Sequence, residues 1–312
     1  MRRSTWIALV IFCVCCGATA APLASSADDG SLTDPFSVAY RTQRLHMLAP
    51  ELLRLAAATP GLVAITVEDL KTGRSIAVNG GRNLPAASTI KIPVMVEVFR
   101  DIDDGAFTLA RTVSLTDDDR DCGFGDLCEA PDGSAYSVEQ LLVASIDDSD
   151  NTAANMLIRL VGRTSINETM RELGLNQTRL GDSIRSDGDI RVLRTSADDM
   201  LHLLTGIADG QVVSPGASRA MFRLLAQQRH NSLLPASLPT GLVVAHKTGT
   251  LHDTLNDVGI VELHGTPYVI CAFSTHLADL DDGERFIRRA SRLAFEALDT
   301  PLDGLANSNA RL

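Results

Sequence analysis

Residues 84–91 read Leu-Pro-Ala-Ala-Ser-Thr-Ile-Lys, a short loop that runs into an apolar helical segment. The pattern of the chain changes here. Before it, residues 62–69 and 75–78 predict two strands joined by a turn at 71–73. After it, apolar residues recur at intervals of three and four, which predicts helices over 92–99, 137–146, 151–160, 165–173 and 197–206.

Strands return near the C-terminus. An early helix over 45–58 stops at Pro60-Gly61, and a further helix is expected over 214–228. The remaining elements are predicted as strands over 242–246, 258–263 and 268–274 and a closing helix over 284–298. Strands from both chain ends around a run of helices predict an α/β (α+β) fold with one sheet and an inserted all-helical lobe.

We expect one catalytic domain over 41–300, because a single core can grow to about 250–300 residues. Its α/β lobe takes residues 41–85 and 232–300, and its helical lobe takes 86–231. Residues 21–40 are rich in Ala, Ser, Asp and Pro and are expected to form a flexible linker. Residues 301–312 are expected to form a flexible tail.

The first twenty residues have the pattern of a secretory signal peptide. Two arginines precede an apolar run over 7–16, and Ala18-Thr19-Ala20 offers a cleavage site. The protein is therefore expected to be exported, either periplasmic or secreted. A lipid anchor on Cys15 or Cys16 is less favoured, because neither follows the usual leucine and small residue.

The net charge and the composition limit the kinds of partner that this protein can bind. A formal net charge of −11 disfavours nucleic acid and anionic membrane surfaces, and the ten-residue apolar run is too short to span a bilayer. The seven histidines are scattered, so no metal and no cofactor is expected. We expect a monomer that acts on a small molecule.

The cysteines suggest one disulfide. In an oxidising compartment, Cys122 and Cys128, six residues apart, are expected to pair rather than to bind a metal. Cys271 lies in an apolar stretch, where a buried inert thiol is expected.

Lysine is scarce: the chain has three, Lys71, Lys91 and Lys247. A lysine amine can be desolvated into a neutral base, whereas a guanidinium stays protonated. Lys71 lies at the predicted hairpin tip, where a structural role is expected. The other two point to chemistry, with a lowered pKa expected at Lys91 and a persistent charge at Lys247.

Ser88 and Lys91 are three residues apart where a loop enters a helix. Their side chains should share one helix face and come into contact. With its pKa lowered by the helix N-terminus and a second cation, Lys91 could take the proton of Ser88 and make it a nucleophile.

Two further motifs follow. Ser149-Asp150-Asn151 lies between two helices, where it reads either as a functional loop or as an ordinary N-cap. Lys247-Thr248-Gly249-Thr250 ends an apolar strand, and a glycine there indicates close backbone approach by a ligand; another turn is the alternative. The serine of the second motif is 61 residues beyond Ser88, and Lys247 is 98 residues further.

Together, in this order and spacing, the three motifs resemble those of the penicillin-interacting serine hydrolases, in particular class A β-lactamases. The resemblance covers about residues 41–298. It implies a β-lactamase/transpeptidase-like fold with a five-stranded antiparallel sheet flanked by helices, and an active site in a cleft between two lobes.

The resemblance also implies roles for individual residues. Ser88 would be the acylated nucleophile, Lys91 its proton-transfer partner, and Ser149 the relay to the leaving nitrogen. Asn151 would contact the substrate amide. The substrate carboxylate would bind Lys247 and Thr248 beside Gly249, and the backbone amides of Ser88 and Thr250 would form the oxyanion hole.

One family feature is missing. Class A enzymes carry a glutamate on an Ω-shaped loop that activates the deacylating water, but residues 181–191 contain neither glutamate nor proline. Asp182, Asp187 and Asp189 are candidate substitutes, although aspartate is one methylene shorter and a general base must reach its water. The alternative is that they are solvated loop carboxylates paired with Arg185 or Arg191.

The sequence thus predicts a serine hydrolase acylated at Ser88 that opens β-lactam rings and deacylates slowly. One alternative is a DD-peptidase or esterase acting on cell-wall peptides or small esters. Another is a sensor that binds β-lactams or peptidoglycan-like peptides without turnover.

Overall fold

The computed structural model describes residues 35–186, 188, 192–263 and 266–299. The expected signal peptide, the expected tail, Asp187 and Asp189 lie outside these residues. The first helix, α1 (Pro35–Ala58), begins six residues inside the segment expected to be a linker. Pro35 fits this start, because proline is tolerated in the first turn of a helix.

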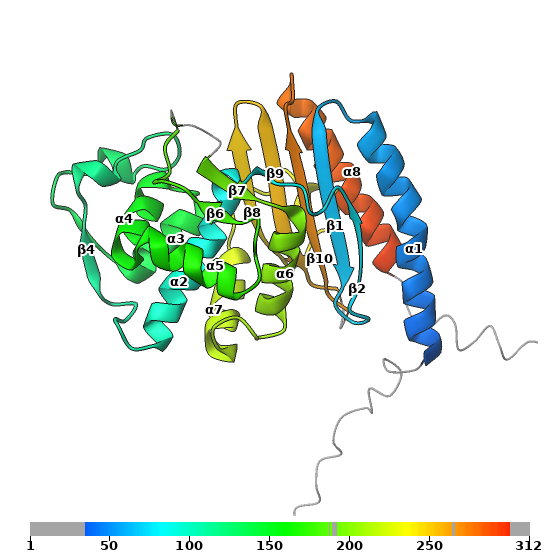
Figure 1. Cartoon of the computed structure of the whole chain (residues 1–312), viewed down its shortest axis with the longest axis horizontal. Helices are drawn as coiled ribbons and strands as arrows, with labels where there is room; N and C mark the ends of the chain where they lie inside the picture. Colours follow the sequence, from blue (N-terminus) through cyan, green and yellow to red (C-terminus); the bar gives the residue numbers. More distant parts are fainter. Residues whose placement is uncertain (1–34, 187, 189–191, 264–265, 300–312) are drawn as a thin grey trace, which may run out of the picture.

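A five-stranded antiparallel sheet forms the centre of the molecule (Figure 1), in the strand order β2-β1-β10-β9-β8. The strands are β1 (Leu62–Asp69), β2 (Arg74–Val78), β8 (Val244–Leu251), β9 (Thr254–Val261) and β10 (Tyr268–Thr275). The sheet is built from both chain ends, as predicted. The turn at Lys71-Thr72-Gly73 joins β1 to β2, and Gly73 has a φ of +61°, which glycine adopts without strain.

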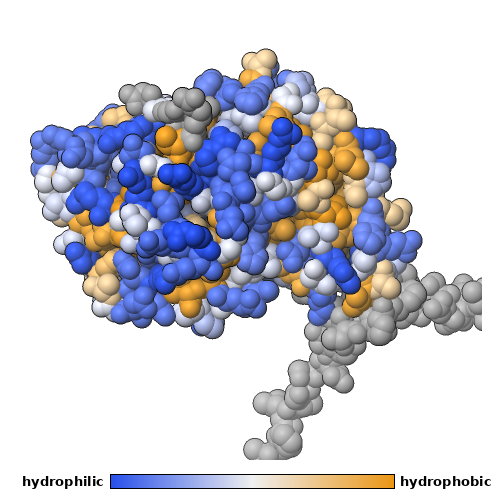
Figure 2. All heavy atoms as spheres, in the orientation of Figure 1, coloured by the Kyte–Doolittle hydropathy of each residue, from blue (hydrophilic) through white to orange (hydrophobic). Residues whose placement is uncertain are grey.

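Helices cover both faces of the sheet (Figure 1). Helices α1 and α8 (Leu280–Leu298) pack on one face, with a core that includes Leu52, Ile65 and Phe286. The opposite face shares a second core with the helical lobe. Apolar side chains reach the surface where the sheet meets α8 and α1, whereas hydrophilic ones gather over α4 and α5 (Figure 2).

The helical lobe lies between β2 and β8 in sequence, as predicted. Its helices are α2 (Lys91–Asp103), α3 (Val138–Asp147), α4 (Asn151–Val161), α5 (Arg163–Glu172), α6 (Ala197–Ala208) and α7 (Pro215–Leu225). Two small sheets complete it, β3 (Leu84–Pro85) with β7 (Leu193–Thr195) and β6 (Arg179–Leu180), and β4 (Thr112–Ser114) with β5 (Ala135–Ser137). Ser137 and Gln140 form a capping box at the start of α3.

Polar residues account for the strand boundaries that the sequence misplaces. The prediction ends the β8 strand at His246, but the strand continues through the motif to Leu251. It starts the β9 strand at Val258, but the strand begins at Thr254, and the intervening Asn256 and Asp257 are buried. Both have hydrogen-bond partners inside the protein, which removes the cost of burying them.

Candidate active site

The strand β8 brings the third motif against the loop that carries Ser88. Ser88 lies in the 3₁₀ turn η2 (Ala87–Ile90), directly before α2. Asn256 Nδ2 of β9 donates to Pro85 O at 3.0 Å and Ala86 O at 3.2 Å, which fixes this loop to the sheet. Ser88 itself is half-buried.

Gly249 is required by this packing. A Cβ atom at this position would lie 3.0 Å from Ala86 O and 3.1 Å from Ser88 N. The sequence indicated close approach by a ligand; in the structure, the protein's own segment before the nucleophile approaches Gly249. A larger residue here would require its neighbours to shift by a few tenths of an ångström.

Lys91 is fully buried and directs its amine at the second motif. Its Nζ donates to Asn151 Oδ1 at 2.7 Å, to Ser149 Oγ at 3.2 Å and to the backbone carbonyl of Ser149. In the described chain, no hydrogen bond joins Lys91 to Ser88, although three-residue spacing predicts contact. The Lys91 amine is instead taken up by its acceptors on Ser149 and Asn151.

Lys247 meets the same hydroxyl from the other side. Its Nζ donates to Ser149 Oγ at 3.0 Å and to Thr248 O at 3.1 Å, and the side chain is fully buried. Ser149 Oγ therefore joins two amines. The Ser149 backbone has a φ of +58°, in the left-handed region that is uncommon outside glycine, asparagine and aspartate. Such strain is typical of residues held in place for a function.

The two lysines do not differ in pKa as the sequence predicted. Burial, reinforced by Lys247, lowers the pKa of Lys91 well below its usual value, as expected. Burial also lowers the pKa of Lys247 to about 7, against the opposing effect of Asp257 and Asp147. The expectation of a persistent charge on Lys247 is therefore wrong, because the sequence does not reveal how completely this amine is buried.

Asp150, and not Ser149, caps α4. Its Oδ1 accepts from Ala153 N at 2.7 Å, and its Oδ2 accepts from Leu127 N at 2.9 Å. The N-cap interpretation of this motif thus holds for its middle residue only, which leaves the serine and the asparagine free to contact the lysines.

The disulfide loop holds this motif in place. Cys122 and Cys128 are bonded, with their Cα atoms 5.3 Å apart, as expected. Asn151 N donates to Phe124 O at 3.0 Å. Gly125, at a φ of +82°, lies so close to Asp150 that a Cβ would be 2.1 Å from its Oδ2.

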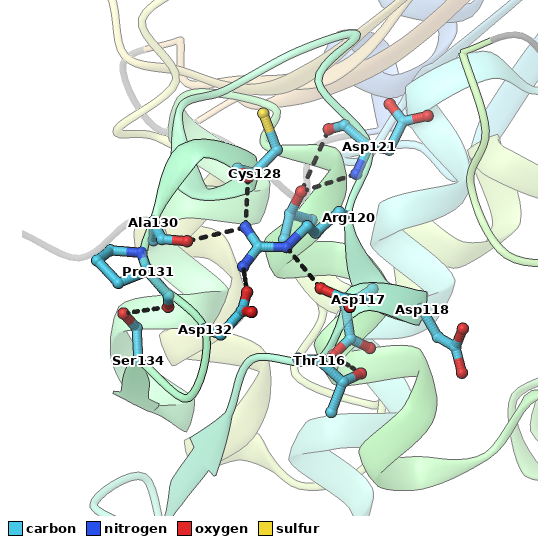
Figure 3. A network of polar contacts seen from close by, with 12 residues as sticks. Thr116, Asp117, Asp118, Arg120, Asp121, Cys128, Ala130, Pro131, Asp132 and Ser134 are labelled. Carbon is cyan, nitrogen blue, oxygen red and sulfur yellow. Dashed lines mark hydrogen bonds and ion pairs between the residues drawn. The ribbon is translucent and has the colours of Figure 1, made fainter.

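Arg120 forms hydrogen bonds to residues before and after the disulfide loop (Figure 3). Its guanidinium donates to Ala130 O at 2.9 Å, to Cys128 O, and to the carboxylates of Asp117 and Asp132. The neighbouring Asp121 accepts from Asn151 Nδ2 at 2.6 Å and from Ser186 N at 2.7 Å. Although burial opposes it, hydrogen bonds from Asn151, Ser186 and Gly123 hold the pKa of Asp121 below its usual value. No sequence pattern pointed to Arg120 or Asp121.

Opening this disulfide should weaken both stability and activity. For Cys122→Ser with Cys128→Ser we expect a loss of about 2 kcal/mol in unfolding free energy and a roughly five- to tenfold drop in kcat/KM. The reason is that the loop contacts both Asp150 and Asn151. Thermal melting and turnover, before and after reduction of the wild type, provide the measurement; equal values with both thiols free would contradict this role.

Two adjoining hollows open at Ser88, and Phe124 and Thr250 line both. The first, of about 200 Å³, continues past Ser149 and Thr248 toward the start of α8. The second, of about 430 Å³, runs toward residues 184–186 and Gly188. Phe124 is 40% exposed and was not singled out from the sequence. The volume of the second hollow is within the range of small-molecule sites.

Of the three deacylation candidates, Asp182 alone belongs to the described residues, and the structure does not bring it to Ser88. Asp182 is exposed and lies 3.3 Å from Arg163, an ion pair that the sequence did not suggest, and it lines neither hollow. Arg185 instead donates to the carbonyls of Arg120 and Asp118. Of the described residues that line the second hollow, none is an aspartate or glutamate.

Within the described ranges, no three His, Cys, Asp or Glu side chains gather into a possible metal site. Cys271 is free and buried in β10, and burial raises its pKa well above the usual value. No helix in the portion that the structure describes is long and apolar enough to cross a membrane.

Known proteins are similar to this chain in fold and in sequence. The profile of the β-lactamase enzyme family matches residues 47–298. A β-lactamase from Kitasatospora aureofaciens is 30% identical over 235 residues, covering 70% of this chain and 73% of that protein. The crystal structure of a β-lactamase from Sphaerobacter thermophilus has a TM-score of 0.75 at 30% identity, covering 79% and 95% of the two chains.

The structure of PBP-A has a TM-score of 0.77 at 30% identity and covers 81% of this chain and 96% of its own. A PBP-A mutant in an acyl-enzyme complex with penicillin G has a TM-score of 0.76. Fold and site together define a serine β-lactamase-like hydrolase with a five-stranded antiparallel sheet. The chain belongs to the β-lactamase enzyme family.

Proposed function

We propose that this protein is an exported enzyme that opens β-lactam rings by forming an acyl-enzyme at Ser88 and releases the product slowly. One observation carries the proposal: two buried amines meet at Ser149 Oγ, on the floor of the cleft that Ser88 lines. Such an arrangement can move a proton from the nucleophile to a leaving nitrogen.

In the acylation step, a neutral Lys91 accepts the proton of Ser88 Oγ as this oxygen attacks the lactam carbonyl. Substrate and water can complete a contact that is absent in the ligand-free site. The lactam C–N bond then breaks, and the nitrogen takes a proton through Ser149. The amides of Ser88 and Thr250 are proposed to stabilise the oxyanion, while Asn151, Lys247 and Thr248 orient the substrate.

Slow deacylation is favoured by the composition of the second hollow. A general base must lie within hydrogen-bond reach of its water, directly or through one further water, and the described lining offers no carboxylate. Asp182 is held at Arg163 instead, which leaves Asp187 and Asp189 as the remaining candidates of the three.

The direct test is nitrocefin hydrolysis by the mature protein and by Ser88→Ala. We expect measurable turnover by the wild type and loss of that turnover in the variant. Wild-type turnover at the level of Ser88→Ala would reject β-lactam hydrolysis as the activity.

The described lining of the second hollow, which lacks a carboxylate, also favours a second candidate, a DD-peptidase acting on cell-wall peptides. Release of a peptidyl acyl group need not use the Ω-loop glutamate of class A enzymes. The similarity to PBP-A is compatible with it. Release of terminal D-Ala from a wall peptide, together with a penicillin burst without turnover, would favour this reading.

The charge of Lys247 should make substrate capture depend on pH. Its amine is cationic below a pKa of about 7 and neutral above it, so kcat/KM for a substrate carrying a carboxylate should fall as pH rises through about 7. Because kcat/KM reports groups of the free enzyme, its pH profile is the measurement.

Lys247→Arg provides the matched control. Arginine stays charged at high pH, so the alkaline fall of kcat/KM should disappear. Because the larger side chain overpacks the buried site at a cost of about 1–3 kcal/mol, the maximum of kcat/KM should be lower. An unchanged alkaline fall in Lys247→Arg would assign it to another group.

A further inference from the structure

His246 is fully buried on β8, one residue before Lys247. Consecutive strand residues point to opposite faces, so His246 lies on the α8 side of the sheet. There its Nδ1 is 2.9 Å and 3.1 Å from the two carboxylate oxygens of Asp257 on β9. An imidazole is ordinarily a stronger base than a carboxylate, so the shared proton belongs on Nδ1.

The other ring nitrogen also faces an acceptor. His246 Nε2 is 3.1 Å from Asn231 Oδ1. The amide orientation of Asn231 is fixed because its Nδ2 donates to Gln228 O at 3.1 Å and to Arg229 O at 3.4 Å. An amide oxygen cannot donate, so Nε2 must carry a hydrogen as well.

We propose that His246 is a buried, positively charged imidazolium that fastens the 228–234 segment to β9 and so positions one wall of the cleft. His230, Ser232 and Leu233 of this segment line the first hollow opposite Thr248. Asp257 completes the attachment, because its Oδ2 accepts from Leu234 N at 3.0 Å. His246 acts through these groups and is a positioning residue.

The imidazolium also bears on the charge of Lys247. The charged groups around Lys247 are Lys91 from α2, Asp147 from the end of α3 and Asp257 from β9. Helix α7 also packs on β8, and its buried face includes the apolar Met221 and Leu225. A cation beside Asp257 offsets the pull of that carboxylate on the Lys247 ammonium, so removing it should let Lys247 hold its proton to higher pH.

The charge itself can be tested without any assumption about activity. Long-range ¹H–¹⁵N correlation spectra of the labelled full-length protein, with His246→Gln to assign the signals, report the protonation of both ring nitrogens. We expect a hydrogen on both ring nitrogens of His246, as its two acceptors, Asp257 and Asn231, require. A single protonated nitrogen on His246 would overturn the proposal.

The positioning role rests on the proposed function and is tested by kinetics. In His246→Gln we expect KM for nitrocefin to rise about tenfold with kcat within about twofold, and the alkaline fall of kcat/KM to move up by about one pH unit. His202→Gln should change neither quantity.

A purely structural role would lower the melting temperature and leave the pH profile in place, and that result would overturn the positioning role. Should His246→Gln fail to fold, the wild-type spectrum, assigned through His246→Asn or by elimination of the other six histidines, still decides the charge. Should β-lactam turnover be absent, the spectrum separates failure of the proposed function from failure of the inference.

Discussion

Lys91→Arg should abolish acylation of Ser88, with kcat/KM reduced by about 10³- to 10⁴-fold. The buried amine of Lys91 has three acceptors from Ser149 and Asn151 and a pKa that burial lowers well below the usual value. Burial favours the neutral amine that the proposed base requires, whereas a guanidinium stays protonated. Stopped-flow acylation by a chromogenic cephalosporin gives the rate.

The chain offers two matched controls for this substitution. Lys71→Arg, at the hairpin tip between β1 and β2, should leave acylation unchanged. Lys247→Arg should retain part of it, because a cation there is compatible with binding the substrate carboxylate. Equal tolerance of arginine at Lys91 and Lys247 would contradict the role of Lys91 as the base.

Ser149→Ala should lower the acylation rate by about 10²- to 10³-fold. Its hydroxyl is the common partner of Lys91 and Lys247, at 3.2 and 3.0 Å, and the proposed proton donor to the leaving nitrogen. Without it, the two amines lose their shared acceptor and the leaving group loses its relay. The same stopped-flow assay measures the loss.

The variant Ser149→Gly distinguishes the effect of losing the hydroxyl from the effect of the backbone conformation. Glycine relieves the positive φ of this residue, so this variant should be at least as stable as Ser149→Ala yet equally impaired. Recovery of the wild-type rate in Ser149→Gly would show that backbone conformation, and not the hydroxyl, sets the effect.

The sequence was a good guide to the elements whose apolar residues are periodic. The hairpin of β1 and β2, the helices of the lobe and the capping box at Ser137 all follow from local patterns. Boundaries failed where polar residues are buried. Asn256 and Asp257 look like loop residues, but the protein supplies their partners through Ala86 and His246, which lie far away or on a neighbouring strand.

The sequence predicted which residues form the site better than it predicted the contacts between them. Motif order singled out four residues: Ser88 and Ser149 line the first hollow, and the buried Lys91 and Lys247 bond Ser149 Oγ. Local spacing could not predict that the Lys91 amine bonds Ser149 and Asn151, or that burial also lowers the pKa of Lys247. Phe124 and Asp121 carry no motif, since their importance comes from the disulfide loop resting on the second motif.

Time-resolved intact-mass measurement after addition of penicillin G tests the central claim most directly. We predict an adduct of one drug molecule that maps to the peptide containing Ser88, forms rapidly, decays slowly and is absent in Ser88→Ala. An adduct that never decays would indicate capture without hydrolysis. Absence of any adduct in the wild type under conditions that resolve slow decay, or an adduct that persists in Ser88→Ala, would contradict the account.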